Sequence, residues 1–128
     1  MNYCKINGKA YDVNVVELTE SFNKLYTENT KRTLAAGRMF LDPIGSFISH
    51  TVTFAPMNNP AAFDELWDFL KFPHREGFAV DIADGQSTIA YEAYTSTGSR
   101  KLSRVVNGVL LWDTMQITFT PMEPQVMP

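Results

Sequence analysis

Cysteine and histidine are scarce in this chain of 128 residues: Cys4 is the only cysteine, and His50 and His74 are the only histidines. A single cysteine cannot form an internal disulfide, which suits folding in a reducing cytoplasm. We expect Cys4 to be a small core residue rather than a reactive thiol. No cysteine or histidine pair has the spacing of a metal site. His50 falls on the apolar side of an expected strand, so we interpret it as a hydrogen-bonded core or interface histidine.

Long hydrophobic runs are also missing. No window approaches the ~18 consecutive apolar residues of a transmembrane helix, so no membrane insertion is expected. The N-terminal stretch "MNYCKINGKAYDV" has no apolar core, so it does not look like a signal peptide. Neither a Gly-rich phosphate loop nor a G-x-S-x-G nucleophile motif occurs. The sequence therefore predicts a structural or binding protein that is not an enzyme, with no catalytic residue, cofactor or metal site.

Charge of one sign is not in large excess. The net charge of −3 is too small to indicate electrostatic binding of nucleic acid. Basic residues nevertheless concentrate in residues 28–38 and 98–106, while the rest of the chain is acidic. Two solvated loops would explain this pattern. The alternative is a pair of basic edges that meet an acidic face on a neighbouring copy.

Alternating apolar and polar residues predict that most of the chain is β-strand. The predicted strands cover residues 13–26, 47–55, 78–83, 89–94 and 109–119. A helix is the competing interpretation of residues 13–26, but their β-branched and aromatic content favours a strand. Apolar residues make up 45% of the chain, which fits one domain with one core.

Gly, Asn and Pro mark the expected connections. Asn7-Gly8, Asp84-Gly85 and Asn107-Gly108 predict tight two-residue turns, the first of them within an N-terminal hairpin. Pro43 and Gly45 predict a turn before the second strand. The remaining expected connections are a long loop or hairpin at residues 27–38, a basic loop at residues 97–104 and an extended C-terminal tail from about residue 121.

One segment, "NNPAAFDELWDFLKFP", predicts a helix over residues 60–71. Asn59 is a suitable N-cap and Pro60 fits the first turn, while Pro73 prevents continuation. The apolar residues recur at helical spacing and form one stripe: Phe63, Leu66, Trp67 and Leu70. A helix this short needs packing to be stable in water, so we expect the stripe to be a core contact. The expected fold is mainly β, an antiparallel β-sandwich or partly closed barrel with this one flanking helix.

The order of these parts resembles the tail-tube-like fold of bacteriophage tail and baseplate proteins. An N-terminal hairpin, a strand and a long loop are followed by "GRMFLDPIGSFISHTVTF", the helix "FDELWDFLKFP", two hairpins and a last strand in "WDTMQITFTPMEP". The resemblance spans most of residues 3–122. It implies a single tail-tube-like domain over residues 1–128, in which a β-sandwich is flanked by one helix and a long loop helps to form a ring.

The resemblance also implies an architectural role. Copies of the chain would assemble as a ring, commonly six-fold, in the tail tube, hub or distal baseplate of a virion, together with other tail proteins, after synthesis in the bacterial cytoplasm. A channel that passes DNA is expected to avoid a basic lining, so Lys31 and Arg32 would fit a contact between subunits better than a channel wall. The candidate interface residues are Asn29, Thr30, Lys31, Arg32, Arg38, Asp64, Asp68, Arg100, Lys101 and Arg104.

A binding module is the alternative function. In this hypothesis a small β-barrel holds an apolar ligand or a host-surface glycan. Its platform would be three aromatic residues, Tyr91, Tyr94 and Trp112.

Overall fold

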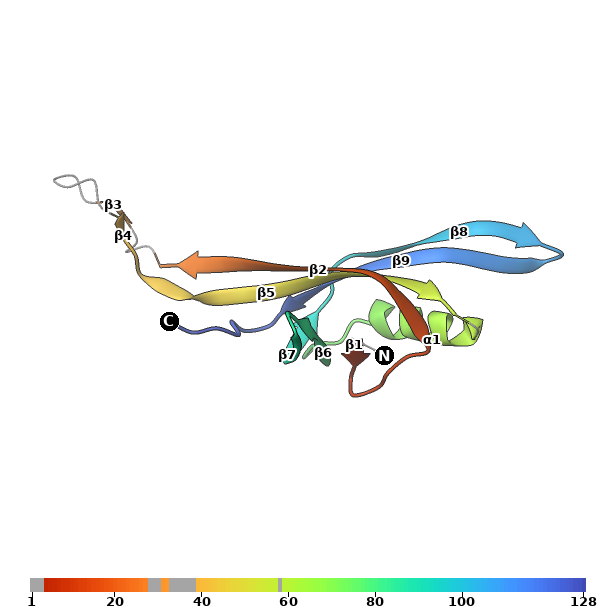
Figure 1. Cartoon of the computed structure of the whole chain (residues 1–128), viewed down its shortest axis with the longest axis horizontal. Helices are drawn as coiled ribbons and strands as arrows, with labels where there is room; N and C mark the ends of the chain where they lie inside the picture. The colour runs from red at the N-terminus through yellow and green to blue at the C-terminus, as the bar shows by residue number, and fades with distance from the viewer. Residues whose placement is uncertain (1–3, 28–30, 33–38, 58) are drawn as a thin grey trace.

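A computed structural model describes residues 4–27, 31–32, 39–57 and 59–128 of the chain (Figure 1). Within these ranges the elements, in chain order, are β1 (Cys4–Ile6), β2 (Val13–Tyr26), β3 (Lys31–Arg32), β4 (Met39–Phe40), β5 (Pro43–Pro56), α1 (Pro60–Lys71), β6 (Phe78–Asp84), β7 (Ser87–Tyr94), β8 (Gly98–Val106) and β9 (Val109–Pro121). The predicted class is confirmed, because the structure is mainly antiparallel β with one helix and its sheet is not closed into a barrel.

The strands lie in two layers that share β9. The first layer has the order β8-β9-β5-β2, and the second has the order β1-β6-β7. The last residues of β9 turn into the second layer, where Thr120 and Pro121 pair with β7. Helix α1 lies beneath the first layer, beside the second (Figure 1). The core fills the space between these parts, and its largest fully buried side chains include Phe54, Phe63, Leu66, Ile82 and Phe119.

Two long hairpins extend from the body in opposite directions (Figure 1). We call residues 20–26 of β2 with residues 43–50 of β5 the β2–β5 arm, and residues 101–106 of β8 with residues 109–114 of β9 the β8–β9 arm. The ladders are offset along the sheet, because β5 meets β9 only from His50 to Phe54, whereas β2 pairs with β5 from Val13 to Tyr26. The first layer is therefore strongly staggered.

Helix α1 forms as its sequence predicts. The side chain of Asn59 accepts a hydrogen bond from the backbone N–H of Ala61 at 3.2 Å, which caps the first turn. Phe63, Leu66 and Leu70 of the predicted stripe are buried, and Trp67 packs against the core while partly exposed. Burying these side chains contributes on the order of 6–12 kcal/mol before the entropy of ordering them.

The predicted turn at Pro43 and Gly45 is wrong, because both residues belong to β5. Pro43 pairs with Tyr26 and Gly45 with Leu25, so the strand begins four residues before the predicted start at residue 47. Proline is tolerated there because it is the first residue of the strand. A Cβ atom on Gly45 would lie 2.8 Å from both the Pro124 side chain and the Val126 carbonyl oxygen, so glycine serves close packing at this position.

The predicted basic loop at residues 97–104 is also wrong, since Gly98–Val106 is strand β8. The segment lacks clean alternation, and register shifts interrupt its pairing with β9 on both sides of Leu102. Pairing with a long neighbouring strand therefore overrides a weak local pattern.

The turn predictions are largely confirmed. Asn107 and Gly108 have φ angles of 52° and 79°, as a type I′ turn requires. The turn after β6 lies one residue later than predicted, since Asp84 pairs with Ser87 and leaves Gly85 and Gln86 in the loop. At the N-terminus the Asn7-Gly8 turn forms, but its hairpin is a single bridge between Ile6 and Lys9. The ladder of β1 is made with β6 instead.

Candidate functional site

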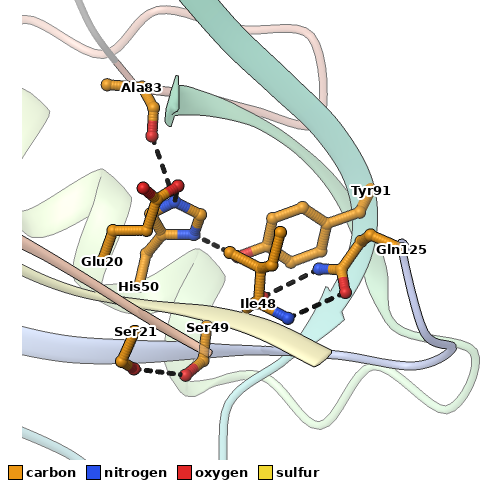
Figure 2. Close-up of polar contacts among 8 residues, drawn as sticks. All are labelled: Glu20, Ser21, Ile48, Ser49, His50, Ala83, Tyr91 and Gln125. Carbon is orange, nitrogen blue, oxygen red and sulfur yellow. Dashed lines mark hydrogen bonds and ion pairs between the residues drawn. The ribbon is translucent and has the colours of Figure 1, made fainter. Parts of the chain in front are cut away.

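The two layers are joined by a polar cluster around His50, whose side chain is fully buried. Figure 2 shows the ring of His50 reaching from β5 towards Tyr91 of β7, with Glu20 of β2 and the carbonyl of Ala83 of β6 on its other side. Nδ1 lies 2.8 Å from the Tyr91 hydroxyl, and Nε2 lies 3.1 Å from both the Glu20 carboxylate and the Ala83 oxygen. The prediction of a hydrogen-bonded core histidine is confirmed.

The partners of His50 indicate which ring nitrogen carries the hydrogen when the imidazole is neutral. Nε2 faces two oxygen acceptors, one of them a backbone carbonyl that can never donate, so Nε2 carries the hydrogen. Nδ1 is then an acceptor, and the Tyr91 hydroxyl donates to it. The imidazole of His50 on β5 thereby bonds to groups from three other strands, and both ring nitrogens have partners, as a buried polar side chain requires.

The environment of the cluster shifts the pKa values of its neighbours. Loss of solvent raises the pKa of Glu20 above its ordinary value, and a hydrogen bond with Asp84 raises it further. Burial likewise raises the pKa of Tyr91, so the phenol stays protonated. Burial raises the pKa of Cys4 to about 12, which confirms a core residue with little thiolate at neutral pH. The cluster thus holds the layers together through the hydrogen bonds of His50.

Arg100 and Asp64, two predicted interface residues, contact each other within one chain. A guanidinium nitrogen of Arg100 lies 2.8 Å from a carboxylate oxygen of Asp64. The same guanidinium lies over two indole rings, 4.8 Å from the centroid of Trp67 and 4.2 Å from that of Trp112. This contact links the β8–β9 arm to helix α1.

The other predicted interface residues are dispersed. Asp68 lies 3.4 Å from Lys71 of its own helix, and both side chains are largely exposed. Lys101 and Arg104 are exposed on β8. Lys31 and Arg32 form β3, which pairs with β4 beyond the end of the β2–β5 arm. The predictions for Asn29, Thr30 and Arg38 lie outside the described residues.

The first layer has a free edge at each end. Within the described residues β2 pairs only with β5, and β8 pairs only with β9, so the outer sides of both strands lack a partner strand. The arms also expose large apolar side chains. On the β8–β9 arm these are Leu102, Val105, Val106, Val109, Leu110 and Leu111, and on the β2–β5 arm Phe22, Leu25, Tyr26 and Ile44. Free edges beside exposed apolar side chains are typical of surfaces that other chains cover.

A cleft of about 770 Å³ lies beside the C-terminal end of α1, between the helix and the connection from β7 to β8. Phe72, His74 and Tyr94 line it. The three platform residues of the alternative hypothesis do not converge there, because Tyr91 is engaged by His50 and Trp112 by Arg100.

Sequence reasoning missed two features of this region. The first is the pairing of Glu20 with His50. Its only signal in the sequence is that Glu20 is an acidic residue on the apolar side of the strand at residues 13–26. The second is the clamp of Gln125 on Ile48 (Figure 2), which has no sequence signal. The side-chain oxygen of Gln125 accepts from the Ile48 N–H at 2.9 Å, and its side-chain nitrogen donates to the Ile48 carbonyl at 2.8 Å.

Among the residues that the structure describes, no group of three or more His, Cys, Asp or Glu could hold a metal ion. In the same ranges, no helix is both long and apolar enough to span a membrane.

No known protein-family model matches the chain, and no curated protein sequence matches it either.

Proposed function

We propose that the protein is a structural component of a bacteriophage or prophage tail and that its copies assemble into a ring. The observation that carries the ring is the four-stranded first layer with two long free edges. The resemblance of the element order to tail-tube-like proteins supplies the biological setting: tube, hub or distal baseplate of a virion, with other tail proteins as partners and no catalysis.

The two free edges are suited to each other. Adjacent strands in the order β8-β9-β5-β2 are antiparallel throughout, so β8 and β2 run in opposite directions. When copies are placed side by side in the same orientation, β8 of one copy therefore meets β2 of the next as an antiparallel neighbour. Such a head-to-tail contact uses two different surfaces, and it closes into a ring when the rotation between copies allows. The stagger between the ladders is what a closed, tilted arrangement of strands needs.

Charge supports the same pairing. The β8 edge carries the exposed Lys101 and Arg104, while β2 carries Glu17 and Glu20 with a single Lys24. Opposite signs on the two edges favour pairing of β8 with β2 over pairing of either edge with itself.

The outer face of the first layer fits the wall of a central channel. Thr19, Thr51 and Thr118 lie opposite one another across three strands, and the hydroxyls of Thr51 and Thr118 are 3.2 Å apart. Ser21 and Ser49 continue this row with hydroxyls at 2.9 Å. The row is polar and uncharged, as expected for a wall along which a polyanion such as DNA can pass.

Light scattering after size-exclusion chromatography, with electron microscopy of the peak, tests the proposal. We expect a closed assembly of several copies. Lys101→Glu with Arg104→Glu should shift the protein towards single copies at low salt, and adding Glu17→Lys should restore part of the assembly. Arg75→Glu, an exposed residue outside both edges, is the matched control and should behave as the wild type. A wild-type protein that stays a single copy at high micromolar concentration, alone and with partner tail proteins, would refute the ring.

A further inference from the structure

The C-terminal tail lies in a position on β5 that β9 leaves vacant. Phe119 faces His50, so continuing β9 in register would bring Glu123 opposite Ser46. The chain instead turns away to pair with β7 and then returns, and Val126 faces Ser46. The tail thus covers β5 at Ser46 and Ile48, on the side of the β2–β5 arm that faces away from β2.

Backbone-type hydrogen bonds hold the tail in place. Ser46 donates to the Val126 carbonyl at 2.8 Å and accepts from the N–H groups of Gln125 and Val126 at 3.1 and 3.4 Å. The Gln125 amide group acts like a further peptide unit: it accepts from the Ile48 N–H at 2.9 Å and donates to the Ile48 carbonyl at 2.8 Å. Side-chain burial adds little, since Val126 and Met127 are 51% and 65% exposed.

The edge of β5 beside the tail is suited to pairing with the same edge of a second copy. The part of β5 that precedes its pairing with β9, residues 43–49 ("PIGSFIS"), contains no Asp, Glu, Lys or Arg. Natural sheets protect their edges with charges, bulges or proline, and a long uncharged strand rich in β-branched and aromatic residues is a template for aggregation. Here the protection comes from the tail, whose Pro124 and Pro128 cannot donate to a further strand.

We propose that the tail is a strap that keeps this edge of β5 closed, and that the partner it excludes is the same edge of a second copy. Two copies of one edge pair antiparallel about a two-fold axis, so the contact is self-complementary. The absence of charge from β5 removes the like-charge repulsion that would otherwise oppose it. This inference is independent of the proposed ring, which uses the β2 and β8 edges.

A full-length variant with a reversible strap tests the proposal. Gln125→Ala removes the clamp on Ile48. Ser46→Cys with Val126→Cys, added to the same chain, allows a disulfide between two residues that already face each other, and Cys4 is buried away from them. The oxidised form holds the strap closed and the reduced form lets it open. Gly45→Val releases the strap independently, because its Cβ would collide with Pro124 and Val126.

Native mass spectrometry and amide hydrogen exchange are the two measurements. In the reduced triple variant and in Gly45→Val, the Ser46 and Ile48 amides should exchange faster and the mass of the assembly should increase about twofold over the wild type. The oxidised form should keep the wild-type mass, and so should Gln116→Ala, a matched change at an exposed glutamine. An unchanged mass together with faster exchange would show that a second copy does not pair with the exposed edge of β5. Unchanged exchange would show that these contacts do not hold the tail, and either result overturns the proposal.

Discussion

At the scale of single residues, His50 shows how a titratable side chain is accommodated in an apolar interior. Its ring has no exposed surface, yet each nitrogen has an oxygen partner, so the cost of burying it is offset by hydrogen bonds. The alternation of residues 47–55 indicates that this position points inwards. It does not indicate the partners, because Glu20, Ala83 and Tyr91 come from three other strands.

Tyr91→Phe should destabilise the fold although it keeps the ring. Loss of the hydroxyl leaves Nδ1 of a buried histidine without its donor, which costs about 1–3 kcal/mol in the free energy of unfolding. Tyr94→Phe is the matched control, since Tyr94 is 42% exposed and its change should lie within about 0.5 kcal/mol. Urea denaturation measures both. Equal effects would mean that the hydrogen bond of Tyr91 contributes no more than a surface hydroxyl does.

At the scale of elements, the two arms are anchored in different ways. The β2–β5 arm continues a ladder that runs from Val13 to Tyr26 and is braced by the tail. The β8–β9 arm is irregular, with register shifts around Leu102, and is tied to the body by the stacking of Arg100 between Trp67 and Trp112. The planar guanidinium suits this place because it can stack on both rings and still bond Asp64.

Arg100→Lys should therefore not be a conservative change. An ammonium keeps the charge but loses the planar stacking, so we expect a loss of about 0.5–2 kcal/mol in the free energy of unfolding. Arg104→Lys on the exposed part of the same strand should be close to neutral. Chemical denaturation followed by tryptophan fluorescence reports both. If the two variants are equally stable, the stacked arginine does not anchor the arm.

At the scale of the whole molecule, the acidic outer face of α1 has two parts with different surroundings. Asp64 pairs with Arg100 and Glu65 with Lys9 of the same chain, whereas Asp68, among the residues that the structure describes, forms its ion pair with its exposed helical neighbour Lys71. The hypothesis that this face meets a basic segment of another copy is thus tested most cleanly at Asp68.

Asp68→Lys should weaken assembly and leave the fold intact. An exposed ion pair within one helix contributes about 0.3–0.5 kcal/mol, so its loss has little effect on unfolding. Asp64→Lys is the informative comparison, because it also brings a second cation against Arg100 and should lower the stability of the single chain. Light scattering gives the assembly state and urea denaturation the stability. Wild-type assembly in Asp68→Lys would exclude this side chain from the interface.

Much of the fold could be predicted because its information is local. Asn107-Gly108 requires positive φ angles that few residues accept, and Asn59-Pro60 with the apolar stripe specifies where α1 begins and which face is buried. The errors at Gly45 and at residues 97–104 share one cause. In both places a segment with weak or misleading local preference is held as a strand by residues distant in the chain, β2 in one case and β9 in the other.

The sequence by itself determined the class of the protein, the single helix, the inward direction of His50 and the sites of the tight turns, since these depend on periodicity and on backbone preferences within a few residues. Only the tertiary structure decided that Asp64 and Arg100 satisfy each other in one chain, that four strands share one imidazole and that the tail fills the strand position beside β5. Those outcomes depend on which distant segments become neighbours, and the alternation of a strand specifies its two faces but not the strand that lies beside it.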